Sequence, residues 1–271
     1  MPTRHSLFLT FLVLCISALW APAYAQSAER VLEFFDASGP IRVQAEVVWG
    51  VIRVTGHDGD DIRLSATHTP EGGSAQPVAD LAEYVTVQSQ SDAYSIRGRR
   101  PRDGAFESID LTLAVPARAD VSAHISRGGE VIVEGINGVV DISQRNGSVV
   151  LRNLGGAALV NALNGSIEAT FRAVDPEQSL SFIALNGGID LTFPGSYRAN
   201  VRLRTERNGY ITSEFSLPEV DYPYAAEARE GTAKPLYSQQ PIEIQSTING
   251  GGPVLVATTE NGPIHIRRRR R

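Results

Sequence analysis

The chain lacks most of the features that usually reveal a protein's chemistry. Its 271 residues include one cysteine, Cys15, so neither a disulfide framework nor a cysteine metal site is available. Beyond residue 25, no apolar stretch approaches the roughly 20 residues that a membrane-spanning helix needs. No Gly-x-Ser-x-Gly elbow and no phosphate-binding glycine loop occurs. Serine-hydrolase and nucleotide chemistry therefore have no support in the sequence.

The first 25 residues have the pattern of an export signal. One cation, Arg4, precedes an apolar run from Leu7 to Trp20, and residues 23–25 form the small-x-small pattern of a cleavage site. We therefore expect residues 1–25 to be a signal peptide that takes Cys15 with it. The mature chain is expected to be exported to the periplasm, the cell surface or the medium, without a transmembrane segment.

Charge is distributed unevenly along the chain. There are 25 basic and 30 acidic residues in all, but Arg4 and the five consecutive arginines 267–271 account for six of the basic ones. Residues 26–266 thus have 19 basic residues against 30 acidic ones. The arginine run could bind phosphate-bearing envelope polymers or anionic lipid, or it could be a solvated tail that balances the acidic body. Such an acidic body would repel nucleic acid, which we do not expect as a partner.

Glycine marks an internal repeat. Glycines follow one another at nine-residue intervals from Gly129 to Gly165, and the interval then widens to 22 residues, giving Gly187 and Gly209. The three wider copies read NGSIEATF, NGGIDLTF and NGYITSEF. In most copies, aliphatic residues stand two and four positions after the glycine with a polar residue between them. This alternation is the period of a strand with one buried face.

The repeat predicts an all-β fold of the β-solenoid type, with β-helix-like coils that turn at Asn-Gly dipeptides. The copies run in the same direction every 18 to 22 residues, which matches one coil better than one hairpin. An antiparallel β-meander or sandwich is the alternative. A solenoid would stack two sets of equivalent residues about 4.8 Å apart, the first as a hydrogen-bonded amide ladder and the second in the core. These sets are Asn164, Asn186 and Asn208, and Ile167, Ile189 and Ile211.

Several segments depart from the repeat. Residues 78–84 and 224–229 could each form one helical turn, and insertions occupy residues 69–77 and 217–241. The second insertion is long for a structureless loop, which predicts a functional segment or a cap on the edge of the solenoid. Between residues 180–184 and 201–205 the apolar pattern slips by one position, which leaves their register open. We expect one domain, residues 26–266, followed by the poly-arginine tail 267–271.

The repeat resembles the bacterial adhesin families that are built on β-strand repeats. These include the head-domain type named after a Gly-Ile-Asn signature, which is present here as Gly135-Ile136-Asn137. The resemblance covers most of the mature chain and is strongest over residues 127–215 and 258–266. It implies an exported β-solenoid with an adhesin-like role, and it brings no catalytic residues.

Two acidic residues are the candidates for chemistry. Glu168 and Asp190 hold the same position in consecutive copies, so a solenoid would place their carboxylates side by side on its outer face. Such a pair could raise one pKa for acid-base catalysis or bind a divalent cation. An exposed polar ladder is the competing interpretation. Because the equivalent position changes from Asp141 to Thr212 across the copies, we assign no catalytic residue.

Metal and cofactor sites are not predicted either. The segment His57-Asp58-Gly59-Asp60-Asp61 concentrates acids, but its spacing matches neither the helical calcium loop nor the calcium-binding β-roll. We interpret it as a polar turn between two strands. The histidines of the mature chain are scattered and lack the short spacing of a transition-metal site.

These observations together predict a non-catalytic, exported, adhesin-like β-repeat protein that acts as an interaction module of the cell envelope or surface. Envelope polysaccharide, anionic lipid or another surface protein would be its partner. A polysaccharide lyase or hydrolase is one alternative, and an accessory protein of an envelope-stress system is another.

Overall fold

The chain folds almost entirely into β-strands. A computed structural model describes residues 29–33, 41–70, 72–78, 80–99, 108–207, 209–217 and 241–270, which form nineteen strands and one short helix. This confirms the all-β prediction. Among the described helices, none is long and apolar enough to cross a membrane. The expected signal peptide, the helical turn at 224–229 and most of the 217–241 insertion lie outside the described residues.

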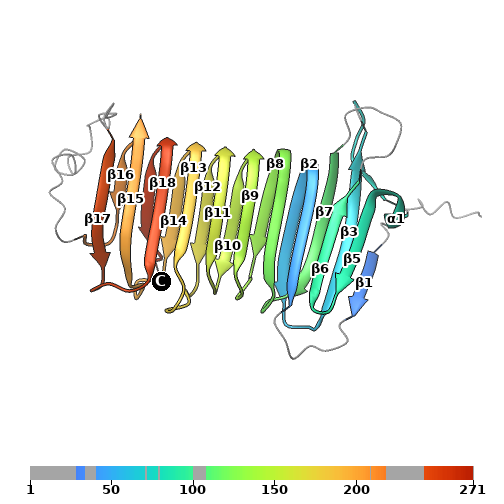
Figure 1. The fold of residues 1–271 in the computed structure, drawn as a ribbon, viewed down its shortest axis with the longest axis horizontal. Coiled ribbons are helices and arrows are strands. Elements are labelled where there is room, and N and C mark those ends of the chain that lie inside the picture. Colours follow the sequence, from blue (N-terminus) through green and yellow to red (C-terminus); the bar gives the residue numbers. More distant parts are fainter. Residues whose placement is uncertain are drawn as a thin grey trace, which may run out of the picture.

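The strands form one continuous sheet of nineteen strands, which folds into two layers whose inner faces share one hydrophobic core (Figure 1). We call these layers sheet A and sheet B. Two long strands, β2 (Arg42–His57) and β8 (Asp120–Glu134), cross from one sheet to the other and join them. Sheet A contains, in spatial order, β5 (Val85–Gln90), β6 (Ala93–Gly98), the first halves of β2 and β8, β9 (Val140–Asn146), β11 (Ala158–Asn164), β13 (Leu180–Asn186), β18 (Val254–Asn261), β15 (Ala199–Arg207) and β17 (Ile242–Ile248).

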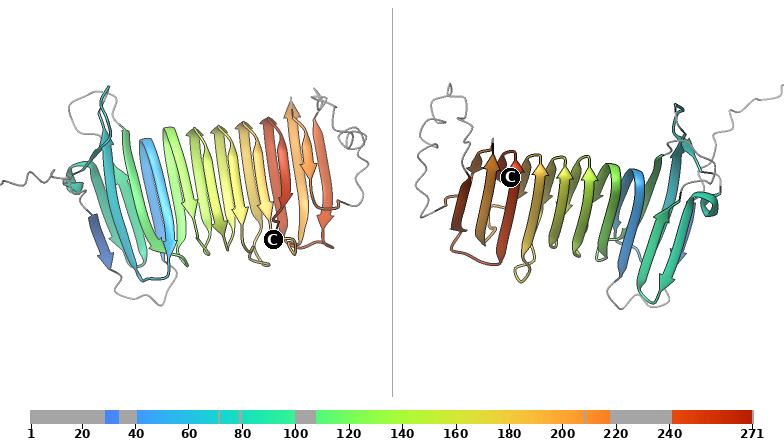
Figure 2. Two further views of the ribbon diagram at one scale, coloured as in Figure 1. Left: turned by 180° about the vertical axis from the view of Figure 1, so that it is seen from behind. Right: turned by 45° about the horizontal axis from the view of Figure 1, so that its top comes forward.

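Sheet B is built the same way behind it. It contains β1 (Glu29–Glu33) and β4 (Gln76–Pro77) beside β3 (Asp61–Thr69), then β7 (Ser108–Pro116), the second halves of β2 and β8, β10 (Val149–Leu154), β12 (Ile167–Phe171), β14 (Ile189–Phe193), β19 (Ile264–Arg268) and β16 (Ile211–Ser213). Figure 2 shows both sheets from behind and in a view tilted so that the top of the molecule comes forward.

The middle of the molecule is a solenoid. Neighbouring coils pair in parallel, and equivalent repeat positions lie opposite each other. Ile167 lies opposite Ile189, and Asn164 lies opposite Asn186. Antiparallel pairs among the described strands occur at the two ends of the molecule. At the N-terminal end, β3 pairs with β1, β4 and β7, and β5 pairs with β6. At the C-terminal end, β15 pairs with β17. The predicted solenoid is therefore confirmed, and the alternative meander applies to the ends alone.

The nine-residue glycine spacing corresponds to half a coil. Gly129, Gly147 and Gly165 stack at one corner, whereas Gly138 and Gly156 stack at the other. A Cβ atom on Gly147 would lie 1.6 Å from the carbonyl oxygen of Gly129, and one on Gly165 would lie 1.8 Å from that of Gly147. Both residues also have positive φ angles, +125° and +158°. No other residue type fits this corner.

An asparagine ladder runs beside the glycine corner. The Nδ2 atom of Asn164 donates to Oδ1 of Asn146 over 2.8 Å. Asn186 donates to Asn164 over 2.7 Å, and Asn261 donates to Asn186 over 2.8 Å. The ladder predicted for Asn164 and Asn186 is confirmed, and it is longer than expected.

The C-terminal coil lies between two coils that follow each other earlier in the chain. Strand β18 separates β13 from β15, and β19 separates β14 from β16 (Figures 1 and 2). Ile189 therefore lies opposite Ile264, which in turn lies opposite Ile211. The predicted stacking of Ile211 directly on Ile189 was wrong, because sequence similarity shows which segments are equivalent and not the order in which they stack.

One extra residue explains the register that the sequence left open. Arg207 lies opposite Asn261, at the position that asparagine holds in the other coils. Asn208, for which the ladder was also predicted, lies outside the described residues. The corner glycine Gly209 stands two residues after Arg207, whereas Gly187 directly follows Asn186. The inward-facing residues of β15 are therefore one position further from their corner glycine than those of β13 are. Thr205 faces inward there and donates to the carbonyl oxygen of Gly262 over 3.0 Å.

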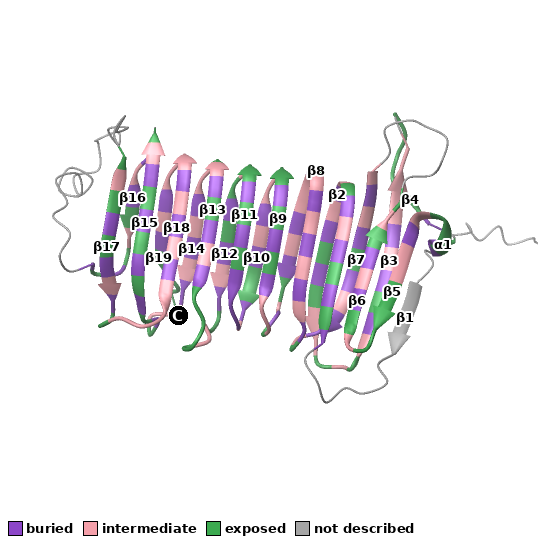
Figure 3. Ribbon diagram, viewed as in Figure 1, coloured by how far each residue is buried: buried purple, intermediate pink, exposed green. Residues whose placement is uncertain are grey.

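Stacked apolar rows fill the space between the sheets, and along most of the strands whose burial is described, buried residues alternate with more exposed ones (Figure 3). An aromatic ladder runs through them. The ring centroids of Phe171 and Phe193 lie 5.0 Å apart, and those of Phe193 and Tyr197 lie 4.1 Å apart. Each buried phenyl ring stabilises the fold by about 1.5–3 kcal/mol. Burial also raises the pKa of Tyr197 well above its usual value.

Two of the predicted departures from the repeat lie at the N-terminal end. The helical turn predicted at 78–84 is α1 (Leu81–Tyr84), and the Asp80 carboxylate caps it by accepting from the backbone N–H of Ala82 over 2.9 Å. The first insertion contains β4, which pairs with the end of β3.

Candidate functional site

The two predicted carboxylates lie side by side on the outer face of sheet B. Glu168 of β12 is opposite Asp190 of β14. Arg267 of β19 makes a two-pronged contact with Asp190, with Nε 2.8 Å from Oδ1 and Nη2 2.6 Å from Oδ2. This hydrogen bonding raises the pKa of Arg267. Since both oxygens of Asp190 are engaged, the arrangement favours a structural ion pair over an acid-base pair.

The row of outward side chains continues past Asp190. His265 lies opposite both Asp190 and Thr212, and its Nδ1 is 2.7 Å from the hydroxyl of Thr212. Burial lowers the pKa of His265; the nearby Arg267 acts in the same direction and Asp190 in the opposite one. The cluster therefore presents a neutral imidazole at neutral pH.

The arginine run begins inside a strand. Arg267 and Arg268 belong to β19. The backbone N–H of Arg268 donates to Oε2 of Glu214 over 2.8 Å, and the backbone N–H of Arg269 donates to the carbonyl oxygen of Phe193 over 2.8 Å. The predicted boundary between body and tail at residue 267 thus falls within sheet B. Arg271 lies outside the described residues.

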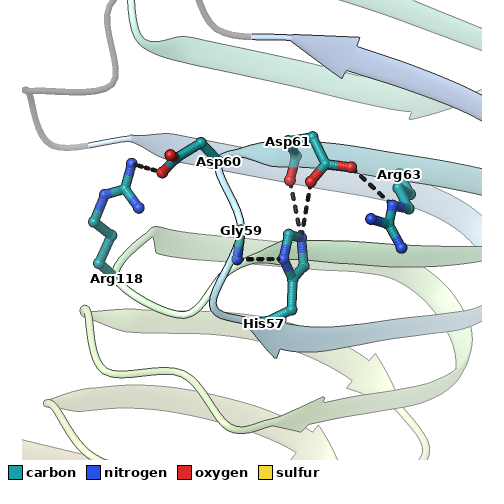
Figure 4. A network of polar contacts seen from close by, with 6 residues as sticks. All are labelled: His57, Gly59, Asp60, Asp61, Arg63 and Arg118. Carbon is teal, nitrogen blue, oxygen red and sulfur yellow. Dashed lines mark hydrogen bonds and ion pairs between the residues drawn. The ribbon is translucent and has the colours of Figure 1, made fainter.

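The acidic segment after β2 is the polar turn expected from the sequence (Figure 4). Nε2 of His57 lies 3.0 Å from the carbonyl oxygen of Asp61. Arg118 pairs with Asp60 at 2.7 Å, and Arg63 pairs with Asp61 at 2.8 Å. The contact with Arg63 holds the pKa of Asp61 below its usual value. In the part of the chain that the structure describes, no group of three or more His, Cys, Asp or Glu residues could hold a metal ion.

The outer face of sheet A carries a polar groove that sequence reasoning missed. Five polar side chains form one cross-strand row over β5, β6, β2, β8 and β9, each opposite the next: Gln88, Ser95, Gln44, Ser122 and Asp141. They line an open depression of about 860 Å³. We call this depression, with these five residues, the polar groove. Its residues come from strands far apart in sequence, so no local motif could reveal it.

Beside the polar groove lies an aliphatic patch, which we define as Leu159, Leu163, Ile183, Leu185 and Val256. Leu159, Leu163 and Ile183 are 45%, 38% and 42% exposed, and they are three of the four large hydrophobic residues that are exposed in the described part of the chain. A second depression, of about 520 Å³, adjoins the patch at Leu163. The sequence did contain a signal for the aliphatic patch, because residues 158–164 and 180–186 carry apolar residues at outward as well as inward positions.

Comparisons with known proteins return structural likeness alone. No protein-family model matches the sequence, and no curated protein matches it. Among solved structures, the chain is similar to a candidate cell adhesion protein from Clostridium sporogenes, with 11% identity and a TM-score of 0.46 over 90% of this chain and 100% of that one. It is also similar to a candidate adhesin from Bacteroides fragilis, with 13% identity and a TM-score of 0.32 over 89% and 96% of the two chains. These neighbours at low identity assign no particular family.

Proposed function

We propose that the chain is an exported, non-catalytic, adhesin-like interaction module of the cell envelope, and that it binds polysaccharide through the polar groove of sheet A. The observation that carries the proposal is the uninterrupted row of two amides, two hydroxyls and one carboxylate across five strands. The signal peptide expected at residues 1–25 supports export.

The chemistry of the polar groove suits a neutral or weakly charged sugar polymer. Sugar hydroxyls both donate and accept hydrogen bonds, and the two glutamine amides and the Ser122 hydroxyl can do the same. The hydroxyl oxygen of Ser95 is buried, so Ser95 contributes to the wall of the groove. Neighbouring strands lie about 4.8 Å apart, which is comparable with the length of one sugar unit. Successive sugars of an extended chain could therefore meet successive strands. The open shape of the groove also suits a polymer that extends beyond the site.

A carbohydrate-active enzyme is the second candidate, because Glu168 and Asp190 lie in register on sheet B. The bidentate contact of Asp190 with Arg267 weighs against acid-base chemistry there. The accessory role in an envelope-stress system has no feature of its own in the structure to support it.

The test compares variants of the two faces in the exported chain. Binding to isolated envelope polysaccharide is measured by calorimetry for the wild type, for Gln44→Ala with Gln88→Ala, and for Glu168→Ala with Asp190→Ala. We expect the groove variant to bind about tenfold or more weakly, because two amides are lost, and the sheet B variant to bind like the wild type.

Equal binding by the groove variant and the wild type would refute the proposed site. Shortening of the polysaccharide by the wild type, abolished in the sheet B variant, would establish the enzyme instead.

A further inference from the structure

We infer that the centre of sheet A is a dimer interface, in which two copies of the chain pack their aliphatic patches face to face about a two-fold axis that runs along β13. This inference goes beyond polysaccharide binding and does not depend on it. Three observations lead to it: an aliphatic patch on an otherwise polar face, the extent of that face, and the arrangement of charges on its two flanks.

The aliphatic patch is continuous across three strands. Leu163 and Leu185 lie opposite each other, between the paired positions of β11 and β13, and Ile183 is the diagonal neighbour of both Leu159 and Leu163. Val256 continues the patch onto β18. A contiguous exposed patch of this kind on a soluble protein marks a contact surface.

The surrounding surface is large enough for a stable contact. The strands from β8 to β17 form a row of seven in sheet A, seen side by side in Figure 1. At the usual strand spacing and residue rise, three outward rows over seven strands cover roughly 650 Å². Two such faces bury roughly 1,300 Å² together, within the range of specific protein interfaces.

A two-fold axis along β13 keeps the height of each residue along its strand and reverses the order of the strands. Ile183 and Leu185 then meet their own copies, as a symmetric interface requires. Strand β11 faces β18 of the second copy, so Leu159 meets Val256. Leu163 meets Glu260, whose aliphatic stem can cover it while the carboxylate reaches solvent.

The charges on the two flanks are complementary under the same rotation. Strand β9 faces β15 of the second copy, which brings Asp141 opposite Arg202 and Arg145 opposite Glu206. Strand β8 faces β17, which brings His124 opposite Glu243. Each of these contacts occurs twice in the dimer. Such complementarity sets the register between partners.

The other possible axis, perpendicular to the strands, gives a worse match. It would superpose the middle outward row on itself, so that Arg204 would meet its own copy and Glu243 would meet its own. Within one copy, Arg204 already pairs with Glu206 at 2.6 Å and lies 3.9 Å from Glu243. Like charges placed directly opposite each other oppose association, so the axis along β13 is favoured.

The proposed dimer would leave most of the polar groove open. Strand β17 is the last strand of sheet A at its end, so β2, β6 and β5 of one copy extend beyond the edge of the other. Gln44 and Gln88 stay accessible, and the two grooves lie at opposite ends of the dimer. Two grooves on one rigid particle would strengthen binding to a repeating polymer by avidity.

The first test is the oligomeric state of the exported chain in analytical ultracentrifugation. We expect a concentration-dependent dimer in the wild type and a monomer for Ile183→Arg, which places two cations at the axis. The matched control is Ile132→Arg, the same change at an outward position of β8 on sheet B, and it should dimerise like the wild type. A wild type that is monomeric at its highest soluble concentration would overturn the inference.

The second test is a charge exchange that identifies the axis. Arg145→Glu should weaken the dimer about a hundredfold or more, because two like-charge contacts with Glu206 arise at once. Adding Glu206→Arg should restore dimerisation to within about tenfold of the wild type. A dimer that is insensitive to both Arg145→Glu and Ile183→Arg would form through another face and would refute this interface. Groove binding by the monomeric variant, measured separately, distinguishes failure of the dimer from failure of the proposed function.

Discussion

Single glycines impose the tightest constraint in the molecule. At the corner of the coil, a Cβ atom on Gly187 would lie 2.1 Å from the carbonyl oxygen of Gly165, which is backbone and cannot move alone. The next residue, Gly188, has Pro263 side-chain atoms at 3.3 Å as its nearest neighbours. The two adjacent positions therefore differ sharply in the space that they leave for a Cβ atom.

We predict that Gly187→Ala destabilises the protein by more than about 2 kcal/mol, because the coils must separate and φ is +156°. Gly188→Ala should cost less than about 1 kcal/mol. Chemical denaturation of the two variants measures the difference. Similar losses in both would mean that the corner can relax, contrary to the close stacking seen here.

A second residue-scale prediction concerns His265. Burial lowers its pKa in the folded state, so the folded state binds this proton less readily than the unfolded state does. The associated stability is present above the unfolded-state pKa of about 6.5 and is lost as pH falls from that value through the lower folded-state pKa. Thermal unfolding should therefore show a smaller loss between about pH 8 and pH 5 in His265→Gln than in the wild type.

The neighbours of His265 provide a control for that prediction. Asp190 favours the protonated imidazole and Arg267 opposes it. In Asp190→Asn, the pKa of His265 measured by NMR should therefore fall further below its usual value. A rise would mean that Asp190 does not favour the protonated imidazole.

At the scale of elements, the asparagine ladder joins coils that the glycine corners bring together. Asn164 donates to Asn146 and accepts from Asn186. We predict that Asn164→Ala lowers the free energy of unfolding by about 1–2 kcal/mol, since two hydrogen bonds are lost. Asn161→Ala, on the same strand but outside the ladder, should stay within about 0.5 kcal/mol of the wild type in the same denaturation assay.

The ladder also bears on chemical durability. Asn-Gly turns deamidate when they are flexible, but here the side-chain amides of four such turns are linked by three consecutive hydrogen bonds. These asparagines should stay intact on prolonged storage of the folded protein and deamidate in denaturant. Peptide mapping of the two samples would detect the difference, and equal rates would contradict a rigid ladder.

At the scale of the whole molecule, the C-terminal coil links two parts of the fold. Strands β18 and β19 pair on one side with the coil that contains β13 and β14, and on the other side with the coil that contains β15 and β16. The β15, β16 and β17 segment therefore cannot complete its pairing until the end of the chain has folded. This order makes the contacts of the C-terminal end strongly non-local, which slows folding.

We predict that removal of residues 254–271 abolishes cooperative unfolding of the C-terminal end, because β15 loses its parallel partner. Removal of residues 270–271, which lie beyond the last backbone contact of Arg269 with Phe193, should leave stability unchanged. Hydrogen exchange of β15 and β17 measures the outcome. Full protection of both strands in the longer truncation would show that the C-terminal coil is dispensable.

Much of the fold could be predicted because its rules are local. Alternation around Ile167 and Ile189 specifies strands with one buried face, and Asn-Gly specifies the turns between them. The adjacency of Glu168 and Asp190 followed from the same period. The partner of Asp190 could not be predicted, because Arg267 is 77 residues away and reaches it through the insertion of β19.

The sequence by itself determined the strands, the corners and the parallel direction of the repeat, since these depend on side-chain alternation and on glycine at fixed intervals. Only the tertiary structure decided the order of the coils, because Ile211 and Ile264 have equivalent motifs and either could pack against Ile189. It also decided the two outer surfaces. The polar groove and the aliphatic patch are assembled from strands that are distant in the chain, and their chemistry arises when parallel pairing aligns those strands in one sheet.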